Sequence, residues 1–343
     1  MRNHEENPEA VKIGVIGAGS WGTTLADLLA KKHDSVTLWA YEPDLVERMR
    51  GSRENDLFLP GFQLAENLVV TNDLAVAAAG KDLLLLVPPS QLMRRVVNQA
   101  VPHIAHGTLI VSAAKGIENE TLQLMSQVLG EVLPAPLTER LAFLSGPSFA
   151  REVAAEMPTA VAIAAASPAV AKAAQEVFNT AAFRVYTNDD VIGVELGGAL
   201  KNVIALAAGV ADGLGFGHNT RAALITRGLA EMTRLGVALG AEPATFAGLA
   251  GMGDLVLTCT GDLSRNRTVG MELGRGRSLE DILNGMTMVA EGVKTTLSTY
   301  QLAAKLGIEV PITDQMYRIL YQGKSPRQAV NDLMLRDLKA EGV

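Results

Sequence analysis

The sequence predicts an α/β domain with a doubly wound, mostly parallel sheet, followed by an all-helical domain. Two observations lead to this fold class. In the first half of the chain, short apolar runs alternate with helical stretches, and the runs are near-continuous, which is typical of parallel strands buried on both faces. After about Asn188 this strand pattern stops. We therefore expect the α/β domain over residues 1–189 and the helical domain over residues 190–343.

Eight apolar runs have the length and composition of buried strands. They are residues 11–16, 36–40, 68–70, 83–87, 108–112, 141–144, 160–164 and 183–187. Six helices are expected after them, over residues 191–208, 220–239, 279–283, 295–305, 315–320 and 326–332. Gly240 follows the second of these helices, at the position where glycine commonly ends a helix.

Composition and charge narrow the possible functions. The net charge of -7 disfavours binding to nucleic acids or anionic membranes. The single cysteine, Cys259, allows no internal disulfide, which suits a reducing compartment, and we expect it to be a buried small residue. His103 and His106 have no carboxylate or cysteine nearby to complete a metal site, so no metal is expected.

The chain is expected to be cytoplasmic, without an integral membrane segment. Residues 1–10 lack the apolar stretch of a secretory signal. The most apolar later segment, residues 203–211, is much shorter than the roughly 20 residues that span a bilayer.

A glycine-rich sequence follows the first predicted strand and begins a helix that ends near Lys32. Gly17 permits a tight turn, Gly19 lets the backbone approach a pyrophosphate, and Gly22 lets the helix pack closely on the strand. The free N–H groups and the positive dipole end of the helix favour phosphate charge. The pattern indicates a dinucleotide-binding domain of the Rossmann type, although a simple strand-to-helix turn has a similar glycine spacing.

Glu42 lies 20 residues after Gly22, where an acidic residue usually binds the adenine ribose hydroxyls of NAD. No arginine occupies residues 41–43 to receive the 2′-phosphate of NADP, although arginines follow from residue 48 onward. The cofactor is therefore expected to be NAD or NADP, with NAD favoured. Glu42 is alternatively a solvated helix-cap residue before Pro43.

Two lysines are candidates for catalysis. Lys115 comes just after the fifth predicted strand, at the edge where open α/β sheets bind ligands, although a solvated loop lysine is also compatible with this position. Lys201 lies in a helix that is apolar almost all round, where a charge is usually paired or functional. Its side chain would cover Gly197 and Gly198, which either leave room for a small ligand or allow tight helix packing. Burial lowers the pKa of a lysine towards the working pH, as proton transfer requires.

A third group of candidates lies in the helical half of the chain. Asp254 stands in a glycine-rich turn and can pair with an ammonium group. Ser264, Arg265 and Asn266 offer a hydroxyl, a guanidinium and an amide. This donor set suits a dianionic phosphate, unless the three residues form a surface turn.

Six motifs in order resemble those of bacterial NAD(P)-dependent glycerol-3-phosphate dehydrogenase, from about Lys12 to Leu338. They are GAGSWG at 17–22, AAKGIE at 113–118, SGPSFA at 145–150, GGALKN at 197–202, GMGDLVLTC at 251–259 and SRNR at 264–267. The resemblance implies hydride transfer between NAD(P)H and dihydroxyacetone phosphate, giving sn-glycerol 3-phosphate for phospholipid synthesis. A homodimer is also expected.

The resemblance also implies roles for individual residues. Lys201 matches the proton acceptor, Lys115 lies beside the reacting oxygen, and Asp254 and Thr258 match active-site positions. The implied substrate contacts are Lys115, Gly146, Ser148, Lys201, Asp254, Ser264, Arg265 and Asn266. With the glycine motif and Glu42 included, the expected cofactor contacts are Gly17, Gly19, Ser20, Trp21, Gly22, Tyr41, Glu42, Lys115, Ala150, Arg265, Val289 and Glu291. Tyr41 stands where many bacterial members have histidine or arginine, which weakens any preference for NADP.

Two other functions remain open. A β-hydroxyacid dehydrogenase of similar architecture would need a carboxylate-binding group where residues 264–266 favour phosphate. A dinucleotide-binding module without turnover would have no use for Lys201 beside paired glycines.

Overall fold

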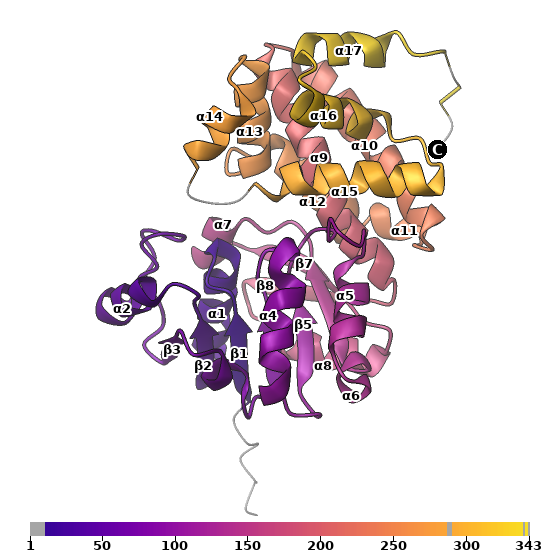
Figure 1. Cartoon of the computed structure of the whole chain (residues 1–343). Coiled ribbons are helices and arrows are strands. Elements are labelled where there is room, and N and C mark those ends of the chain that lie inside the picture. Colours follow the sequence, from indigo (N-terminus) through magenta and orange to yellow (C-terminus); the bar gives the residue numbers. More distant parts are fainter. Residues whose placement is uncertain (1–10, 287–289, 339, 342–343) are drawn as a thin grey trace, which may run out of the picture.

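The computed structural model describes residues 11–286, 290–338, 340 and 341, and the chain forms two layers. In Figure 1 the sheet with its flanking helices lies below, and a group of helices lies above it. The strands are β1 (Lys12–Ile16), β2 (Ser35–Trp39), β3 (Leu68–Thr71), β4 (Leu83–Leu86), β5 (Leu109–Ser112), β6 (Leu141–Ser145), β7 (Thr159–Ala164) and β8 (Phe183–Asn188). All eight predicted strands are confirmed, to within one residue at each end.

The strands form one sheet in the order β3-β2-β1-β4-β5-β6-β7-β8. The predicted mostly parallel pairing is confirmed, with one exception, since β6 and β7 pair antiparallel. From β1 the chain first adds strands on one side, then crosses to β4 on the other. Ligands of open α/β sheets bind outside the carboxyl ends of the strands, at such a reversal of strand order.

Helices cover both faces of the sheet, which explains why the strands are apolar throughout. These helices are α1 (Ser20–Lys32), α2 (Pro43–Ser52), α3 (Leu74–Ala78), α4 (Met93–Ala100), α5 (Met125–Val132), α6 (Ala135–Thr138), α7 (Ala150–Ala154) and α8 (Pro168–Phe178), with short 3-10 turns at Ser90–Leu92 and Val101–His103. Leu29 of α1 and Phe178 of α8 lie in the core on one face. Val97 of α4 and Leu129 of α5 lie in the core on the other.

The upper layer confirms the six predicted helices, most of which extend beyond the expected residues. Its helices are α9 (Val191–Gly213), α10 (His218–Ala238), α11 (Pro243–Phe246), α12 (Asp254–Thr260), α13 (Arg265–Gly274), α14 (Leu279–Asn284), α15 (Glu291–Leu306), α16 (Pro311–Gln322) and α17 (Pro326–Met334). Gly240 has φ +94 just beyond α10, as predicted for a glycine that ends a helix.

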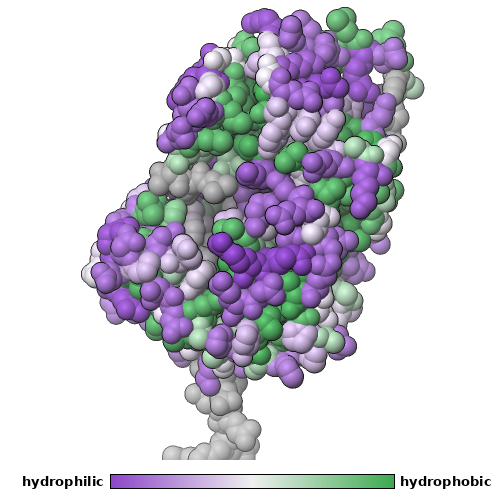
Figure 2. All heavy atoms as spheres, in the orientation of Figure 1, coloured by the Kyte–Doolittle hydropathy of each residue, from purple (hydrophilic) through white to green (hydrophobic). Residues whose placement is uncertain are grey.

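The central helix α9 is long and apolar enough, by composition, to cross a bilayer. The apolar segment noted at residues 203–211 is therefore part of a longer one, because glycine and alanine continue the apolar character on both sides. Within the molecule, 83% of its most apolar window is buried, as in a core helix of a globular protein. On the face drawn in Figure 2, hydrophilic residues predominate and apolar residues lie in separate areas.

Two glycines let α9 and α13 cross in backbone contact. A Cβ at Gly209 would lie 2.0 Å from the Arg267 carbonyl oxygen. A Cβ at Gly270 would lie 2.0 Å from the Leu206 carbonyl oxygen. Any larger residue at either position would push the two helices apart.

Candidate active site

The glycine loop joins β1 to α1 at the reversal of strand order. Gly17 has φ +113, and a Cβ there would lie 2.8 Å from the backbone of Val87. A Cβ at Gly22 would lie 1.8 Å from the Gly17 carbonyl oxygen, so glycine is needed for α1 to pack on this turn. A Cβ at Gly19 would meet no described atom within 4 Å. The loop is tight on the protein side and open in front of α1, which fits a dinucleotide pyrophosphate.

Three residues predicted to contact the cofactor lie in α1 and just after β2. The indole N–H of Trp21 is buried and has no hydrogen-bond partner among the described residues. Tyr41 is 71% exposed. Glu42 directly precedes α2, but its carboxylate accepts no capping hydrogen bond within the described chain, so no contact supports the helix-cap alternative.

Ser20 and Ala150 lie on either side of Thr24. The Thr24 hydroxyl donates to the Ser20 carbonyl oxygen (2.9 Å) and also lies 3.2 Å from that of Ala150, which joins α1 to α7. Val289, another predicted cofactor contact, lies outside the described residues.

Two lysines meet at one carboxylate. Lys201 Nζ lies 2.7 Å from Asp254 Oδ1 and donates to Thr258 Oγ1 at 2.8 Å. Lys115 Nζ lies 2.6 Å from Asp254 Oδ2 and donates to the Gly146 carbonyl oxygen at 3.0 Å. Asp254 is only 1% exposed. The structure thus brings together the candidates from three separate motifs.

The charges of this centre shift the pKa of its members. Burial lowers the pKa of Lys201 to about 8, the nearby Lys115 charge acts in the same direction, and Asp254 opposes both. Burial alone would raise the pKa of Asp254, but the two ammonium groups keep it below its usual range. At neutral pH the centre therefore holds one carboxylate between two ammonium groups, and Lys201 can release a proton near pH 8.

The glycine pair before Lys201 serves helix packing. A Cβ at Gly197 would lie 2.4 Å from the Ala250 carbonyl oxygen. A Cβ at Gly198 would lie 2.5 Å from Ser145 Oγ and 3.4 Å from the Lys115 side chain. Of the two alternatives, the structure supports close packing, because protein atoms lie where each Cβ would be.

Helices replace both turns considered for residues 251–267. The glycine-rich sequence before Asp254 forms a π-helical turn, Leu249–Gly253, that continues into α12. Ser264 caps α13 by accepting from the Arg267 N–H at 3.2 Å, and Arg265 is the first residue of that helix. The Arg265 side chain reaches solvent, although partial desolvation by the surrounding protein lowers the pKa of its guanidinium. A cation at a helix N-terminus is a good phosphate ligand, and the three residues begin a helix rather than form a surface turn.

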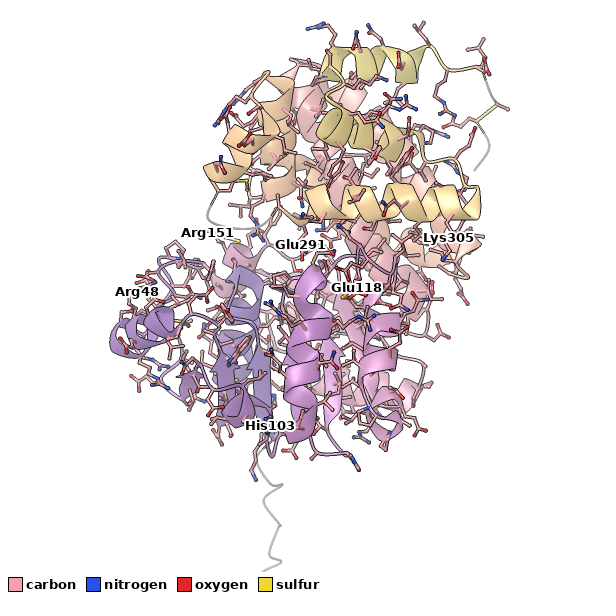
Figure 3. All side chains as sticks on the ribbon, in the orientation of Figure 1. Arg48, His103, Glu118, Arg151, Glu291 and Lys305 are labelled. Carbon is pink, nitrogen blue, oxygen red and sulfur yellow. The ribbon has the colours of Figure 1, made fainter. Side chains whose placement is uncertain are left out.

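Glu291 begins α15 at the junction of the two layers, where Figure 3 labels it. Its Oε1 accepts a hydrogen bond from the Ser90 N–H at 3.3 Å. Burial raises the pKa of Glu291, whereas Arg265, Lys201 and Lys115 act electrostatically to lower it. The three cations therefore share one region with this carboxylate.

Gly146 and Ser148 lie just after β6, at the same edge of the sheet. Gly146 has φ +144, and a Cβ there would lie 2.9 Å from Val161. The Ser148 hydroxyl donates to the Gly146 carbonyl oxygen at 2.9 Å. That oxygen also accepts from Lys115, so this turn is part of the same cluster.

Asn202 was not predicted as a site residue. It is buried next to Lys201, and its Oδ1 accepts from Asn266 Nδ2 at 2.9 Å. Asn266 Oδ1 in turn accepts from the Gly292 N–H at 2.9 Å, which links α9, α13 and α15. The signal was available, because Asn202 is a polar residue in the same apolar helix that drew attention to Lys201.

The described part of the chain contains no group of three or more histidine, cysteine, aspartate or glutamate side chains placed to hold a metal. His103 lies at the lower edge of the sheet layer in Figure 3, at the opposite end from Glu291. Cys259 is buried, as predicted, and burial raises the pKa of its thiol to about 12.

The fold and the site together define a class of protein. A glycine loop open to a pyrophosphate and a buried lysine of lowered pKa lie at the carboxyl edge of one parallel sheet. A helical layer closes over that edge (Figure 1). This is the arrangement of two-domain, nicotinamide-dependent dehydrogenases.

Known proteins identify the particular family. Residues 12–171 match the model of the NAD-dependent glycerol-3-phosphate dehydrogenase N-terminus, and residues 190–331 match that of its C-terminus. The chain belongs to the NAD-dependent glycerol-3-phosphate dehydrogenase family.

Individual relatives match over almost their whole length. A glycerol-3-phosphate dehydrogenase (NAD(P)+) from Syntrophotalea carbinolica is 67% identical, over 96% of this chain and 99% of the relative. One from Citrifermentans bemidjiense is 68% identical, over 97% of this chain and 100% of the relative. The crystal structure of glycerol-3-phosphate dehydrogenase from Coxiella burnetii is 42% identical, with a TM-score of 0.91 over 95% of this chain and 99% of that one. A D-mandelate dehydrogenase at 12% identity and TM-score 0.62 shares the fold alone.

Proposed function

We propose that this protein catalyses reversible hydride transfer between NAD(P)H and dihydroxyacetone phosphate, giving sn-glycerol 3-phosphate. The observation that carries the proposal is the buried centre of Lys201, Asp254 and Lys115, in the same region as Arg265. The names of relatives that are 67% and 68% identical support this reaction over the hydroxyacid and non-catalytic alternatives.

The glycine loop would hold the cofactor. Gly17, Gly19 and Gly22 leave the α1 N-terminus open to the pyrophosphate, with Ser20 and Trp21 in the first turn. The cofactor held there would supply the redox chemistry, giving a hydride in reduction as NAD(P)H and accepting one in oxidation as NAD(P)+. The remaining cofactor contacts that we propose are Tyr41, Glu42, Lys115, Ala150, Arg265, Val289 and Glu291.

Lys201 is the proposed acid and base. In reduction it donates its proton to the oxygen on C2 of the substrate, and in oxidation it takes that proton back. A pKa of about 8 makes both protonation states accessible near neutral pH. Asp254 and Thr258 orient the ammonium group through their hydrogen bonds. Lys115, held by the other oxygen of Asp254, stabilises negative charge that develops on the same substrate oxygen.

The substrate phosphate is proposed to bind at the start of α13. Arg265 supplies a solvent-accessible guanidinium there, and the helix N-terminus adds a positive dipole end. Ser264 and Asn266 flank it, and Gly146 and Ser148 lie beside Lys115 on the facing edge of the sheet.

The organisation of the whole protein is also a proposal. We place the domain boundary between residues 189 and 190, because the last strand ends at Asn188 and α9 begins at Val191. The resemblance to the family supports a cytoplasmic homodimer that makes sn-glycerol 3-phosphate for phospholipids, with no nucleic-acid partner.

A spectrophotometric assay tests the reaction. The purified protein should oxidise NADH or NADPH when dihydroxyacetone phosphate is added, without added metal. Turnover of 3-hydroxyisobutyrate with none of dihydroxyacetone phosphate would instead assign a β-hydroxyacid dehydrogenase. Cofactor binding without turnover of either substrate would leave a binding module.

The same assay tests cofactor choice. NADH should be used at least as well as NADPH, because Glu42 disfavours a 2′-phosphate and the arginines after it are engaged. Arg48, Arg50 and Arg53 each donate to a carboxylate or carbonyl oxygen of the protein. A hundredfold advantage of NADPH in kcat/KM, about 2.7 kcal/mol of transition-state discrimination, would contradict this expectation.

A further inference from the structure

The loop that carries Lys115 runs between the two layers of the molecule. Residues 113–124 follow β5, and their regular structure is limited to one antiparallel bridge between Ile117 and Leu124. Both residues of the bridge are buried in the apolar core of the helical layer. The opposite side of the loop faces the turn at residues 90–94, after β4. Contacts with residues 90–94 hold the loop on the side away from the helical layer.

Gln91 holds the loop backbone at two points. Its Nε2 donates to the Ile117 carbonyl oxygen at 2.7 Å, and its Oε1 accepts from the Asn119 N–H at 2.9 Å. These two groups lie two and four residues after Lys115. One amide side chain thus fixes the path of the chain immediately beyond the lysine.

Arg94 holds the same loop through Glu118. Its Nε and Nη2 both donate to the Glu118 carboxylate, at 3.0 and 2.9 Å, and Nη2 also donates to Gln123 Oε1 at 2.8 Å. Glu118 is only 7% exposed and accepts a further bond from Thr121 at 2.6 Å. Figure 3 shows Glu118 at the junction of the layers, near Glu291. A bidentate ion pair to a buried carboxylate fixes both distance and orientation.

Ser90 connects this turn to the helical layer. Gly116, next to Lys115, packs on Ser90 so closely that a Cβ would lie 2.3 Å from its hydroxyl oxygen. The Ser90 N–H donates to Glu291 at the start of α15. Ser90 therefore contacts both the loop, at the residue that follows Lys115, and the helical layer, at the start of α15.

We propose that Gln91 and Arg94 are positioning residues for Lys115. The tip of Lys115 is bound by Asp254 and the Gly146 carbonyl oxygen, but the position of its backbone depends on the loop. Gln91 and Arg94 set that position from outside the reacting centre. The effect on turnover rests on the proposed function, whereas the positioning itself does not.

Loss of these contacts should have two consequences. A displacement of about 1 Å in a positioned group can cost on the order of 10²-fold in rate. The Lys115 charge also acts on Lys201, whose other charged or titratable neighbours are Asp254, Cys259 and Glu291. When Lys115 moves away, its positive charge no longer lowers the pKa of Lys201. Asp254 then pairs with Lys201 only. Both changes raise the pKa of Lys201.

The test is the double variant Gln91→Ala Arg94→Lys, in which a lysine still neutralises Glu118. Arg318→Lys is the matched control, because Arg318 donates through Nε to both oxygens of Asp314 on α16, away from the Lys115 loop. The first readout is the acetylation rate of Lys115, followed by mass spectrometry with exposed Lys305 as internal reference (Figure 3). The rate should rise at least fivefold in the double variant and stay at the wild-type value in Arg318→Lys.

The second readout is kinetic. In the double variant, kcat/KM for dihydroxyacetone phosphate should fall at least tenfold and its kinetic pKa should move upward. Unchanged Lys115 acetylation, or lost activity at an unchanged kinetic pKa, would overturn the proposal. If the double variant does not fold, Gln91→Ala alone should show the same two shifts in smaller measure. If the wild-type protein shows no turnover, the proposed function is contradicted. The acetylation rates of Lys115 still test the positioning in that case.

Discussion

Asp254 accepts from two ammonium groups at once, Lys115 at 2.6 Å and Lys201 at 2.7 Å, so the three side chains form one connected centre. Lys201 is the member whose pKa lies within the working range, at about 8. Asp254 stays ionised, because both cations lower its pKa. The site therefore has one proton to exchange, and that proton belongs to Lys201.

This assignment fixes the pH dependence. Reduction needs protonated Lys201, so kcat/KM for dihydroxyacetone phosphate should fall as pH rises through about 8, by tenfold per pH unit above it. Oxidation needs neutral Lys201, so kcat/KM for glycerol 3-phosphate should rise with pH and level off above about 8. Initial rates in both directions between pH 6 and 10 measure the two limbs. If kcat/KM changed with pH in the same direction for reduction and for oxidation, Lys201 would be ruled out as the group that exchanges the proton.

A substitution at Arg265 tests phosphate binding separately from proton transfer. Arg265→Lys keeps the charge but loses the planar pair of donors. We expect kcat/KM for dihydroxyacetone phosphate to fall at least tenfold, while the Kd of NADH in the binary complex stays within about twofold, since a bidentate contact to phosphate is lost. Arg275→Lys, on an exposed ion pair of the same helix, is the control. An equal loss of NADH affinity would show that Arg265 holds the cofactor as strongly as the substrate phosphate and does not separate the two.

At the scale of the elements, α9 and α13 set the distance between the proton-transfer centre and the phosphate site. Lys201 lies on α9 and Arg265 begins α13. The two helices meet through glycine, with no side chain between their backbones at Gly209 and Gly270. The prediction from sequence included α9 but not α13. Its sequence has no clear apolar stripe, and its packing depends on glycines that look unfavourable for a helix.

Gly270→Ala tests this crossing. The added Cβ would lie 2.0 Å from a backbone oxygen of α9, so the free energy of unfolding should fall by about 1–3 kcal/mol and the KM for dihydroxyacetone phosphate should rise. Gly130→Ala in α5 is the matched control. Gly130 is an exposed helical glycine, and a Cβ there would meet no described atom within 4 Å, so alanine should stabilise by up to about 1 kcal/mol. Urea unfolding of both variants decides the point. A Gly270→Ala protein as stable as wild type would contradict the close crossing.

At the scale of the whole molecule, strand positions were predictable because burial on both faces leaves long apolar runs. The direction of β7 was not, because composition does not record whether a strand runs parallel to its neighbour. Lys201 was predictable from its apolar helix. That Lys201 and Lys115 both pair with Asp254 was not predictable. Lys115 and Asp254 are 139 residues apart in the sequence, and only the packing of the two layers brings them together. The sequence left the role of the glycines before Lys201 open for the same reason, since their neighbours come from distant segments.

The central claim is that Lys201 transfers the substrate proton, and the kcat of Lys201→Met tests it most directly. Methionine roughly keeps the side-chain length and removes the charge and the proton, while Asp254 stays paired with Lys115, so the melting temperature and NADH affinity should hardly change. We predict that kcat falls by roughly 10²–10⁴-fold, as expected when a positioned proton-transfer group is lost. Lys201→Arg should not restore the rate, because guanidinium keeps its proton near neutral pH. A folded Lys201→Met protein with more than a tenth of the wild-type kcat would contradict the account and make Lys115 the next candidate.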